Sequence, residues 1–432
     1  MRVLYRTFGC KANQYDTERM RQEIEAGGAV TTDAASDADV FVVNTCTVTN
    51  QADADARRLI RRLHREHPEA SIVVAGCSAA LKQSAYEAMQ GVSGVVAGHD
   101  PTAVAVATLP AAPTQIELRS PLDRIDTEPV GGELLRNRRG AARGWLKVQD
   151  GCDRKCSFCA TRLARGASRS RQAAEVVAEA SVLAVSHAEL VITGVHIGHY
   201  GVDLGPKNSL SRLCAQLLDA VPDTRFRLGS IEATEVDDLL LELLEGSGGR
   251  LAPHLHMPLQ SGADPVLRRM RRWHTRAQYR ERAFEIAERV APLGLGADVI
   301  AGFPGETAED HRATHELIDE LPFTYLHVFP YSPRDGTLAA DLPGFVPQRV
   351  AGERARELRA LAEAKGRKYR ASRVGTRARA VLEGAGDSGL TGDYLRVGAG
   401  RPGAVPRGVV EGVLREDGDH LRIDASYEMC PN

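Results

Sequence analysis

The chain carries the stretch Gly151-Cys152-Asp153-Arg154-Lys155-Cys156-Ser157-Phe158-Cys159, in which three cysteines follow one another at C-x3-C-x2-C spacing. Thiolates this close together can bind three irons of a cubane 4Fe-4S cluster. Clusters that serve electron transfer alone usually have four cysteine ligands. A cluster on these three cysteines therefore keeps one iron open for a substrate or a cofactor, and the surrounding fold must present that iron to a pocket.

Two other interpretations of these cysteines fit the sequence less well. A zinc site needs a fourth Cys or His at ligand spacing, and the nearest histidine in the sequence is His187. A disulfide framework would need a higher density than 8 Cys in 432 residues, and no secretory apolar segment opens the chain. No apolar run has the length of a membrane span. We therefore expect a reduced, cytoplasmic protein that makes no membrane contact.

Three more cysteines follow predicted strands in the first part of the chain. Helical patterns over Asp16–Ala26 and Asp53–His67 separate these strands, which is typical of parallel βαβ units. The carboxyl ends of parallel strands meet at one edge of a sheet, so we expect a shared metal site there. Alternatively, each could be an ordinary small buried residue, as we expect for Cys214. The strands and cysteines are Val3–Phe8 with Cys10, Asp39–Asn44 with Cys46, and Ser71–Gly76 with Cys77.

The middle of the chain repeats strand and helix and predicts an α/β fold. Six such units are too few for a closed eightfold barrel, so we expect an open, partial barrel with its chemistry at the carboxyl ends of the strands. The cysteine triplet follows the first strand, as that rule requires. The predicted strands are Trp145–Gln149, Leu190–Thr193, Arg225–Leu228, His254–Met257, Ala297–Ile300 and Tyr325–Phe329. The predicted helices are Gln172–Val185, Val236–Leu244, Arg276–Val290 and Thr307–Leu321.

Polar and glycine-containing segments follow several of these strands. A glycine lets the backbone approach a ligand closely, and together the segments predict a pocket for a polar ligand of adenosine size on one rim. They are Thr193–His196, Ser230–Glu232, Gln260–Gly262 and Asp298–Glu306.

The last part of the chain predicts a small antiparallel β-barrel. Such barrels often bind nucleic acid, although acidic and basic residues are nearly balanced here. Its strands are Ala378–Leu382, Tyr394–Val397, Val409–Leu414 and His420–Ile423. We expect a sheet domain over residues 1–110, a linker over 111–137 that wraps against both neighbours, a central domain over 138–370 and the barrel over 371–432.

The net charge of −2 does not indicate a nucleic-acid-binding protein, but two local runs do. Lys and Arg far outnumber acidic residues over 136–171, and Arg268–Arg276 packs five arginines around Trp273. Such runs can neutralise phosphates, and the indole can stack on a base. They could equally be solvated helix faces with salt bridges. The candidate RNA contacts are Arg138, Arg139, Arg143, Arg165, Arg271, Arg272 and Trp273.

The chain resembles the radical S-adenosylmethionine (SAM) methylthiotransferases over nearly its whole length. The stretches that carry the family resemblance are Thr7–Gln14, Asn44–Thr49, Gly76-Cys77 and the cysteine triplet. The stretches Thr193–Gly201, His254–Gly262 and Leu326–Ser332 are similar to the branch that acts on N6-threonylcarbamoyladenosine next to the tRNA anticodon, at position 37.

The resemblance implies two 4Fe-4S clusters. Cys152, Cys156 and Cys159 would hold the cluster that binds SAM, and Cys10, Cys46 and Cys77 an auxiliary cluster for the inserted sulfur. Around SAM it implies Phe158 near the adenine, Gly194 at the methionine end, Ser230 and Glu232 at the ribose, and Ile300 to Gly302 at the adenine. It further implies a tRNA substrate, a C-terminal TRAM barrel, and a reducing donor such as a flavodoxin or ferredoxin.

Other functions fit the same sequence. The same fold could act on isopentenyladenosine in tRNA or on an aspartate of a ribosomal protein, and the basic runs argue against the protein substrate. A non-catalytic iron–sulfur or zinc protein would bind tRNA but leave SAM intact.

Overall fold

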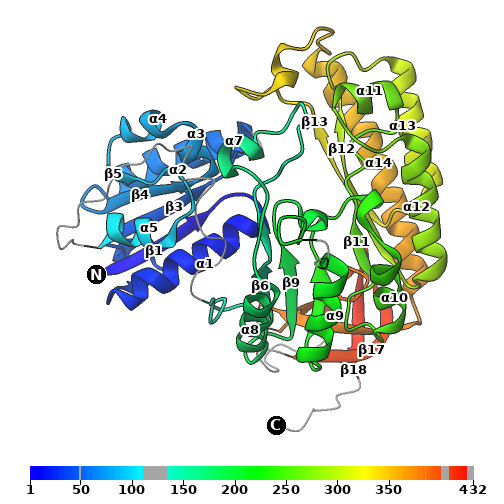
Figure 1. The fold of residues 1–432 in the computed structure, drawn as a ribbon, viewed down its shortest axis with the longest axis horizontal. Helices are drawn as coiled ribbons and strands as arrows, with labels where there is room; N and C mark the ends of the chain where they lie inside the picture. Colours follow the sequence, from blue (N-terminus) through cyan, green and yellow to red (C-terminus); the bar gives the residue numbers. More distant parts are fainter. Residues whose placement is uncertain are drawn as a thin grey trace.

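The computed structural model describes residues 1–47, 50–109, 134–205, 207, 209–384, 386–399 and 408–425. Three units follow one another: a parallel sheet, a larger open barrel and a small closed barrel (Figure 1). Of the expected linker 111–137, residues 111–133 lie outside the described residues. The remaining piece is held between the first two units, because Gln22 bonds the backbone on both sides of Leu135 and the Leu135 amide donates to Glu179.

The N-terminal unit is a five-stranded parallel sheet in the order β2-β1-β3-β4-β5. Its central strand, β3, is buried along its whole length, as a parallel strand covered on both faces requires. The three predicted strands are present, and β2 and β5 were not predicted because they are short or contain Ser and Gly. The strands are β1 (Arg2–Thr7), β2 (Val30–Thr31), β3 (Val40–Thr45), β4 (Ser71–Gly76) and β5 (Val92–Val95).

Helices cover both faces of this sheet (Figure 1). One core contains Met20 and Ile24 of α1 with Val104 of α5. The other contains Ile60 of α2 and Tyr86 of α4. The helices are α1 (Lys11–Ala26), α2 (Asn50–Glu66), α3 (Cys77–Leu81), α4 (Gln83–Glu87), α5 (Pro101–Thr108) and the 3-10 turn η1 (Ala35–Asp37).

The second unit is the predicted open barrel of six parallel strands. They form two three-stranded groups, β10-β9-β6 and β11-β12-β13, which isolated bridges from Phe226 to Leu251 and from Ser230 to His256 join. The strands are β6 (Arg143–Lys147), β9 (Glu189–Thr193), β10 (Arg225–Leu228), β11 (His254–His256), β12 (Gly294–Ala301) and β13 (Tyr325–Pro330), with the short pair β7 (Gln149–Asp150) and β8 (Arg169–Ser170).

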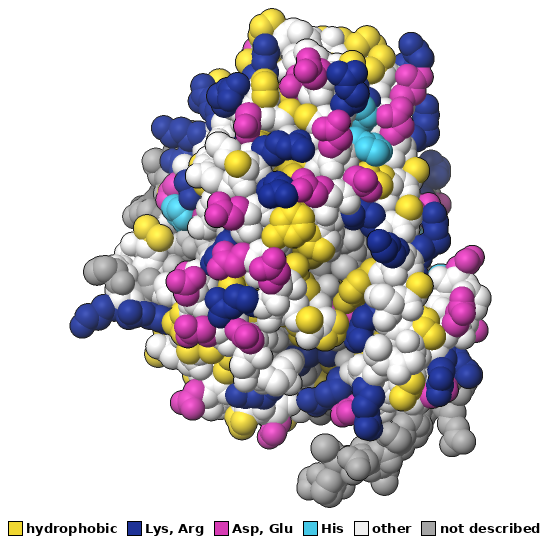
Figure 2. All heavy atoms as spheres, turned by 90° about the vertical axis from the view of Figure 1, so that its right-hand side faces the viewer, with side chains coloured by type: hydrophobic (Ala, Val, Ile, Leu, Met, Phe, Trp, Pro, Cys, Tyr) yellow, Lys and Arg dark blue, Asp and Glu magenta, His cyan; other side chains and the backbone are white. Residues whose placement is uncertain are grey.

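Helices form the outer layer of this barrel. Figure 2 shows that Lys and Arg are mixed with Asp and Glu over this outer face rather than gathered by sign. Pairs such as Arg280–Glu320 and Arg289–Glu245 account for part of that mixing. The helices are α7 (Thr161–Arg165), α8 (Ala173–Ala184), α9 (Leu210–Ala220), α10 (Asp238–Gly246), α11 (Asp264–Arg269), α12 (Arg276–Arg289), α13 (Ala308–Glu320) and α14 (Gln348–Arg373), with the turns η2 (Ile197–His199), η3 (Ala233–Glu235) and η4 (Leu338–Asp341).

The C-terminal unit is a closed barrel in the order β14-β15-β16-β18-β17. It differs from the prediction in two ways, because β15 was missed and β16 pairs with β18 in parallel. Helix α14 runs three residues beyond the predicted domain boundary at residue 370. The strands are β14 (Arg377–Glu383), β15 (Ser388–Thr391), β16 (Arg396–Ala399), β17 (Val409–Asp417) and β18 (His420–Ala425).

The turn from Thr391 to Tyr394 presses the small barrel against the amino ends of the open-barrel strands. The Tyr394 ring stacks on His254 at 4.2 Å, and Arg227 donates to the carbonyls of Thr391 and Gly392, each at 2.8 Å. None of the described helices combines the length and the apolar character that a membrane span requires.

Candidate active site

The three N-terminal cysteines lie at one edge of the parallel sheet. Cys10 directly precedes α1, Cys46 follows β3, and Cys77 is the first residue of α3 after β4. Strands β1, β3 and β4 are neighbours, so their carboxyl ends meet. The charges of Cys10 and Cys46 both act on the Cys77 thiol. The fold therefore gathers these three thiols, which we call the N-terminal trio.

Close backbone packing fixes this trio. Gly9 has a φ of +95°, and a Cβ there would overlap the sulfur of Cys46. Gly76 has a φ of +98°, and a Cβ there would overlap the backbone of Thr45. Both positions thus require glycine. The Asn13 side chain donates to the Thr45 carbonyl at 2.8 Å and so ties α1 to the end of β3.

The other three cysteines, which we call the barrel trio, lie in the loop between β7 and α7, beyond the carboxyl end of β6. All three are half-buried. Arg272 Nη1 donates to the Cys156 sulfur at 3.6 Å, and the Thr161 amide donates to the Cys159 sulfur at 3.4 Å. Donors of this kind favour the thiolate form.

In neither trio do the three sulfurs all lie within 4.8 Å of one another. Two sulfurs on one Zn²⁺ with Zn–S bonds of about 2.3 Å lie less than about 4.6 Å apart. Among the described residues, the groups with three donor atoms all within 4.8 Å of one another contain no cysteine. Wider spacing and an all-thiol donor set suit an iron–sulfur cluster. The compact groups are His196 with His199 and Glu235, and His256 with Asp298 and His327.

Burial keeps several of these thiols from ionising on their own. It raises the pKa of Cys77 to about 12, and it likewise raises the pKa of Cys152 to about 12. Burial also raises the pKa of Cys156, and the positive charge of Arg272 offsets part of that rise. Free thiols of this kind are protonated at neutral pH, whereas a bound metal holds them as thiolates. The raised pKa does not by itself mark a metal ligand, because burial also raises the pKa of Cys214, which lies outside both trios, to about 12.

A buried ionic network joins the two trios. Arg165, in α7 of the open barrel, donates through Nε to the Cys77 sulfur at 3.3 Å. Its other nitrogens bond Asp150 and Asp16, each at 2.8 Å, and Lys147 bonds the same two carboxylates at 2.6 and 2.7 Å. Because these side chains are nearly inaccessible, the network fixes the sheet edge against the loop of the barrel trio.

The loop after β13 closes the other side of this junction. Asn50 donates to the Pro333 carbonyl at 2.6 Å, and Lys82 pairs with Asp335 at 3.5 Å. Burial lowers the pKa of Arg334, while the charges of Cys159 and Cys46 raise it. The Arg334 guanidinium therefore lies near one cysteine of each trio, which brings the two trios to the same junction.

Comparison with known proteins gives the family. Residues 2–98 match the model of the uncharacterized protein family UPF0004, and residues 146–318 match that of the Radical SAM superfamily. The threonylcarbamoyladenosine tRNA methylthiotransferase MtaB of Bacillus subtilis is 37% identical over 85% of this chain and 81% of its own length. The chain belongs to the radical SAM methylthiotransferase family.

Two further relatives and one solved structure describe the range of this likeness. The MtaB of Aquifex aeolicus is 33% identical over 88% of this chain and 93% of its own. The tRNA-2-methylthio-N(6)-dimethylallyladenosine synthase of Sorangium cellulosum is 34% identical over 88% and 81%. The radical SAM methyltransferase TsrM of Kitasatospora setae superposes with a TM-score of 0.58 over 78% of this chain and 77% of that one, and at 18% identity it shows the fold alone.

Two of the seven expected RNA contacts of this methylthiotransferase are wrong. Arg165 is 2% exposed and serves the buried network. The Arg272 side chain is 4% exposed and binds Glu232 and the Cys156 sulfur. Both charges have partners within the protein and cannot reach a phosphate. The remaining five stay predictions: Arg138, Arg139, Arg143, Arg271 and Trp273.

The residues expected around SAM lie near the barrel trio to differing degrees. Phe158 and Ile300 pack against one apolar cluster, whose Phe303 meets Phe158 edge-on at 6.4 Å. Glu232 binds Arg272, which contacts Cys156. These three residues thus belong to the surroundings of the triplet, and their contact with SAM stays a prediction.

The other three expected SAM residues have varied surroundings. Ser230 is exposed at the end of β10. Gly194 packs against Gln149, whose backbone leaves no room for a Cβ. Gly302 has a φ of +76°, and a Cβ there would overlap Ala351 of α14. The structure therefore gives both glycines a packing role, and contact of all three with SAM stays a prediction.

Histidines beside both trios escaped the sequence analysis. His99 Nε2 lies 3.3 Å from the Cys77 sulfur, and His196 Nδ1 lies 3.7 Å from the Cys152 sulfur. The second ring nitrogen of His196 bonds Glu235 at 2.8 Å. A single histidine carries no spacing signal, so the sequence could have indicated only His196, which ends the segment Thr193–His196 after a predicted strand.

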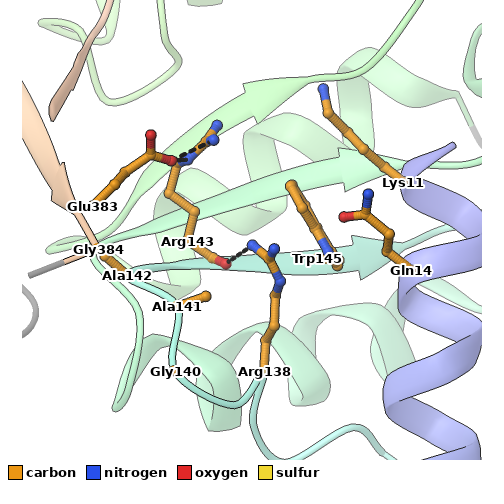
Figure 3. A pocket seen from close by; sticks show the side chains of 10 residues that line it. All are labelled: Lys11, Gln14, Arg138, Gly140, Ala141, Ala142, Arg143, Trp145, Glu383 and Gly384. Atoms are coloured by element: carbon orange, nitrogen blue, oxygen red, sulfur yellow. Dashed lines mark hydrogen bonds and ion pairs between the residues drawn. The ribbon is translucent and has the colours of Figure 1, made fainter. Parts of the chain in front are cut away.

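A cavity of about 390 Å³ lies where the three units meet (Figure 3). The Trp145 indole forms its centre, with cationic side chains around it. Its walls come from α1, from β6 and the segment before it, and from the end of β14. The lining residues are Lys11, Gln14, Arg138, Gly140, Ala141, Ala142, Arg143, Trp145, Glu383 and Gly384.

Proposed function

We propose that this methylthiotransferase converts N6-threonylcarbamoyladenosine at position 37 of tRNA, next to the anticodon, into its 2-methylthio derivative. The relatives from Bacillus subtilis and Aquifex aeolicus, named for that nucleoside, support the substrate. The observation that carries the proposal is the pair of cysteine trios at one junction, in neither of which all three sulfurs lie within 4.8 Å of one another.

Each trio holds one 4Fe-4S cluster in this proposal, and SAM binds at the open iron of the barrel trio. When bound, these groups supply the one-electron chemistry that activates the C–H bond at adenine C2 and the sulfur that is inserted. The donor sets fit, because every ligand is a soft thiolate and each trio provides three of the four ligands of a closed cluster.

The chain itself positions and insulates this chemistry. Arg272 stabilises the Cys156 thiolate by donating to its sulfur, and Glu232 holds Arg272 in place. Arg165 does the same for the Cys77 thiolate from across the junction. Charged donors form the stronger hydrogen bonds. Cys46 and Cys77 are buried, whereas Cys10 is exposed, so the N-terminal trio is shielded from water on the side of Cys46 and Cys77.

The remaining assignments follow from the family. The N-terminal unit serves the auxiliary site and the open barrel serves SAM, and the helix α14 moves the last domain boundary to residue 373. A low-potential donor such as a flavodoxin or ferredoxin supplies electrons. A cytoplasmic location, where tRNA is modified, agrees with this function.

The deciding experiment is mass spectrometry of tRNA nucleosides from a strain that lacks this gene. We expect the 2-methylthio-threonylcarbamoyl nucleoside to disappear and the 2-methylthio isopentenyl nucleoside to persist. If instead the 2-methylthio isopentenyl nucleoside disappears and the threonylcarbamoyl one persists, the substrate is the nucleoside for which the Sorangium cellulosum relative is named. If both nucleosides persist and a ribosomal aspartate loses its methylthio group, the substrate is a protein.

A purified chain that binds tRNA but leaves SAM intact under anaerobic, reducing conditions would instead be a non-catalytic RNA-binding protein. The same reconstituted protein should release 5′-deoxyadenosine if the proposal is right.

A further inference from the structure

Lys11 is a half-buried cation at the cavity in Figure 3 that has no hydrogen-bond or ion-pair partner among the described residues. Its ammonium lies 6.0 Å from the centre of the Trp145 ring. The indole Nε1 of Trp145 is buried and also lacks a hydrogen-bond partner in the described part of the chain. A buried polar group without a partner costs free energy, and of these two donors the half-buried ammonium of Lys11 is the one that a ligand can reach.

The neighbouring arginines do not leave an anion for Lys11. Arg143, Arg225 and Arg227 share the single carboxylate of Glu189, at 3.6, 2.5 and 2.9 Å. Arg143 also takes the carboxylate of Glu383, at 2.5 Å. Four cations thus face two anions, and Lys11 is the only one of the four that pairs with neither carboxylate.

The position of Lys11 relates this charge to the substrate. Lys11 directly follows Cys10 of the N-terminal trio, and Trp145 lies in β6, the strand that leads to the barrel trio. In this proposal a base that reacts between the two trios lies beside two of the three units that form this cavity. Figure 3 shows the indole between Lys11 on α1 and Arg143 on β6.

The N6 substituent of the proposed substrate ends in a carboxylate, which is ionised at neutral pH because such groups have a pKa of about 3.5. The carbamoyl unit and the threonine Cα place it roughly 5 Å beyond N6, that is, one trans peptide-like unit and one C–C bond. A dimethylallyl substituent has a similar reach but no charge. The carboxylate is therefore the one charged group that distinguishes the two nucleosides, beside the neutral urea and hydroxyl groups of the threonylcarbamoyl substituent.

We propose that Lys11 binds the carboxylate of the threonylcarbamoyl group and thereby selects this nucleoside over adenosines with an uncharged N6 substituent. The inference rests on the proposed function. Arg143 and Arg138 keep the electrostatic potential of the site positive.

The test compares two anticodon stem–loop RNAs that differ at one group, with N6-threonylcarbamoyladenosine or its carboxyl methyl ester at position 37. Dissociation constants are measured anaerobically by fluorescence anisotropy on the full chain with both clusters reconstituted. We expect the wild-type protein to bind the acid about tenfold more tightly than the ester, as suits a charged hydrogen-bonded pair. Lys11→Gln should reduce this ratio to about one, and Lys11→Arg should retain most of it.

The matched control is Lys368→Gln, which removes an exposed lysine on α14, away from the cavity, and should leave the ratio unchanged. An unchanged ratio in Lys11→Gln would overturn the inference. So would an equal loss of affinity for both RNAs, which would assign Lys11 to a backbone phosphate. If Lys11→Gln does not retain its iron, the test rests on the wild-type protein alone. A wild-type ratio of ester to acid dissociation constants near one would then overturn the inference.

Failure of the proposed function is a different result. In that case the wild-type enzyme would form no methylthio product on the acid RNA, whatever the binding ratio.

Discussion

The two cysteine trios are built in opposite ways. The barrel trio lies within one loop, from Cys152 to Cys159, so its ligands are close in sequence whether or not the barrel is complete. The N-terminal trio exists only after β1, β3 and β4 have paired in order, because each strand contributes one cysteine. Metal binding adds to the folding free energy of the elements that hold it. The N-terminal cluster should therefore stabilise a whole sheet, and the barrel cluster one loop.

The trios also differ in their surroundings. The cysteines of the barrel trio are all half-buried, which suits a site that must admit a cofactor. In the N-terminal trio Cys10 is exposed, while Cys46 and Cys77 are buried. The Cys77 sulfur is contacted by His99 of its own unit and by Arg165 of the next. The N-terminal trio thus depends on the neighbouring unit in a way that the barrel trio does not.

The largest expected effect separates the two trios by function. Cys156→Ala should abolish both SAM cleavage and product formation. Cys10→Ala should abolish sulfur insertion but leave reductive SAM cleavage, because the barrel trio stays complete. Iron should fall from about eight to about four per chain in either variant, given two 4Fe-4S clusters. The assay is anaerobic measurement of 5′-deoxyadenosine and of modified nucleosides.

Cys214→Ala is the matched control, because Cys214 is a buried cysteine of the barrel core outside both trios. It should keep all its iron. Full product formation by Cys10→Ala would show that the N-terminal trio is not the auxiliary site.

The next effect tests whether backbone packing holds the N-terminal trio. Gly9→Ala introduces a Cβ that overlaps the Cys46 sulfur and imposes a strained φ of +95°. We expect it to lose the auxiliary cluster, about half of the iron, and all product formation. Gly28→Ala meets the same kind of strain at a φ of +91° but has no atom within 4 Å of the new Cβ. This control should cost about 1 kcal/mol and keep its iron. Equal iron in the two variants would contradict the packing argument.

A smaller effect tests the link between the units. Arg165→Met leaves Asp16 and Asp150 buried with Lys147 as their remaining cation. Removing one partner from a buried ionic network typically costs about 3–5 kcal/mol. Urea unfolding followed by circular dichroism should show a loss of this size. Arg280→Met, which breaks an exposed pair with Glu320, should leave the midpoint almost unchanged. Similar losses in the two variants would mean that the network does not join the units.

The smallest effect concerns acid sensitivity behind the barrel trio. His274 is buried, and burial first, then Arg272, lowers its pKa from 6.5 to about 4. The unfolded chain therefore binds a proton below pH 6.5 that the folded chain does not. This contribution to stability is complete above pH 6.5 and is lost as the pH falls toward 4. Between pH 7 and 5.5 the loss should be about 1 kcal/mol.

His274→Gln removes the titrating group, so its unfolding free energy should vary less over that pH range than that of the wild type. The check is urea unfolding of both proteins at pH 7 and 5.5. If the unfolding free energy changes equally with pH in the variant and in the wild type, His274 is protonated in the folded protein as readily as in the unfolded one.

Sequence patterns predicted the trios and the six barrel strands because both are expressed in spacing. C-x3-C-x2-C is local, and each N-terminal cysteine follows an apolar run that reads as a strand. Such local patterns cannot show which side chains from distant parts of the chain form ion pairs. Arg165 lies in a basic run typical of RNA contacts, yet its partner Asp16 is 149 positions away. Arg272 was misassigned for the same reason, since its partner Glu232 belongs to another strand end. Strand β15 was missed because Ser388–Thr391 is short and contains glycine.

Through the turn from Thr391 to Tyr394, the C-terminal barrel closes the open barrel at the amino ends of its strands. Arg225 and Arg227 of β10 donate to carbonyls of that barrel, and Tyr394 lies under His254 and Tyr325. A chain truncated after α14 would lose this closure. The Arg227 guanidinium would also lose two of its acceptors, the carbonyls of Thr391 and Gly392. Deleting the small barrel would therefore disturb the open barrel as well, so it cannot measure the contribution of the small barrel to tRNA affinity alone. A grafted replacement would have to reproduce the turn from Thr391 to Tyr394.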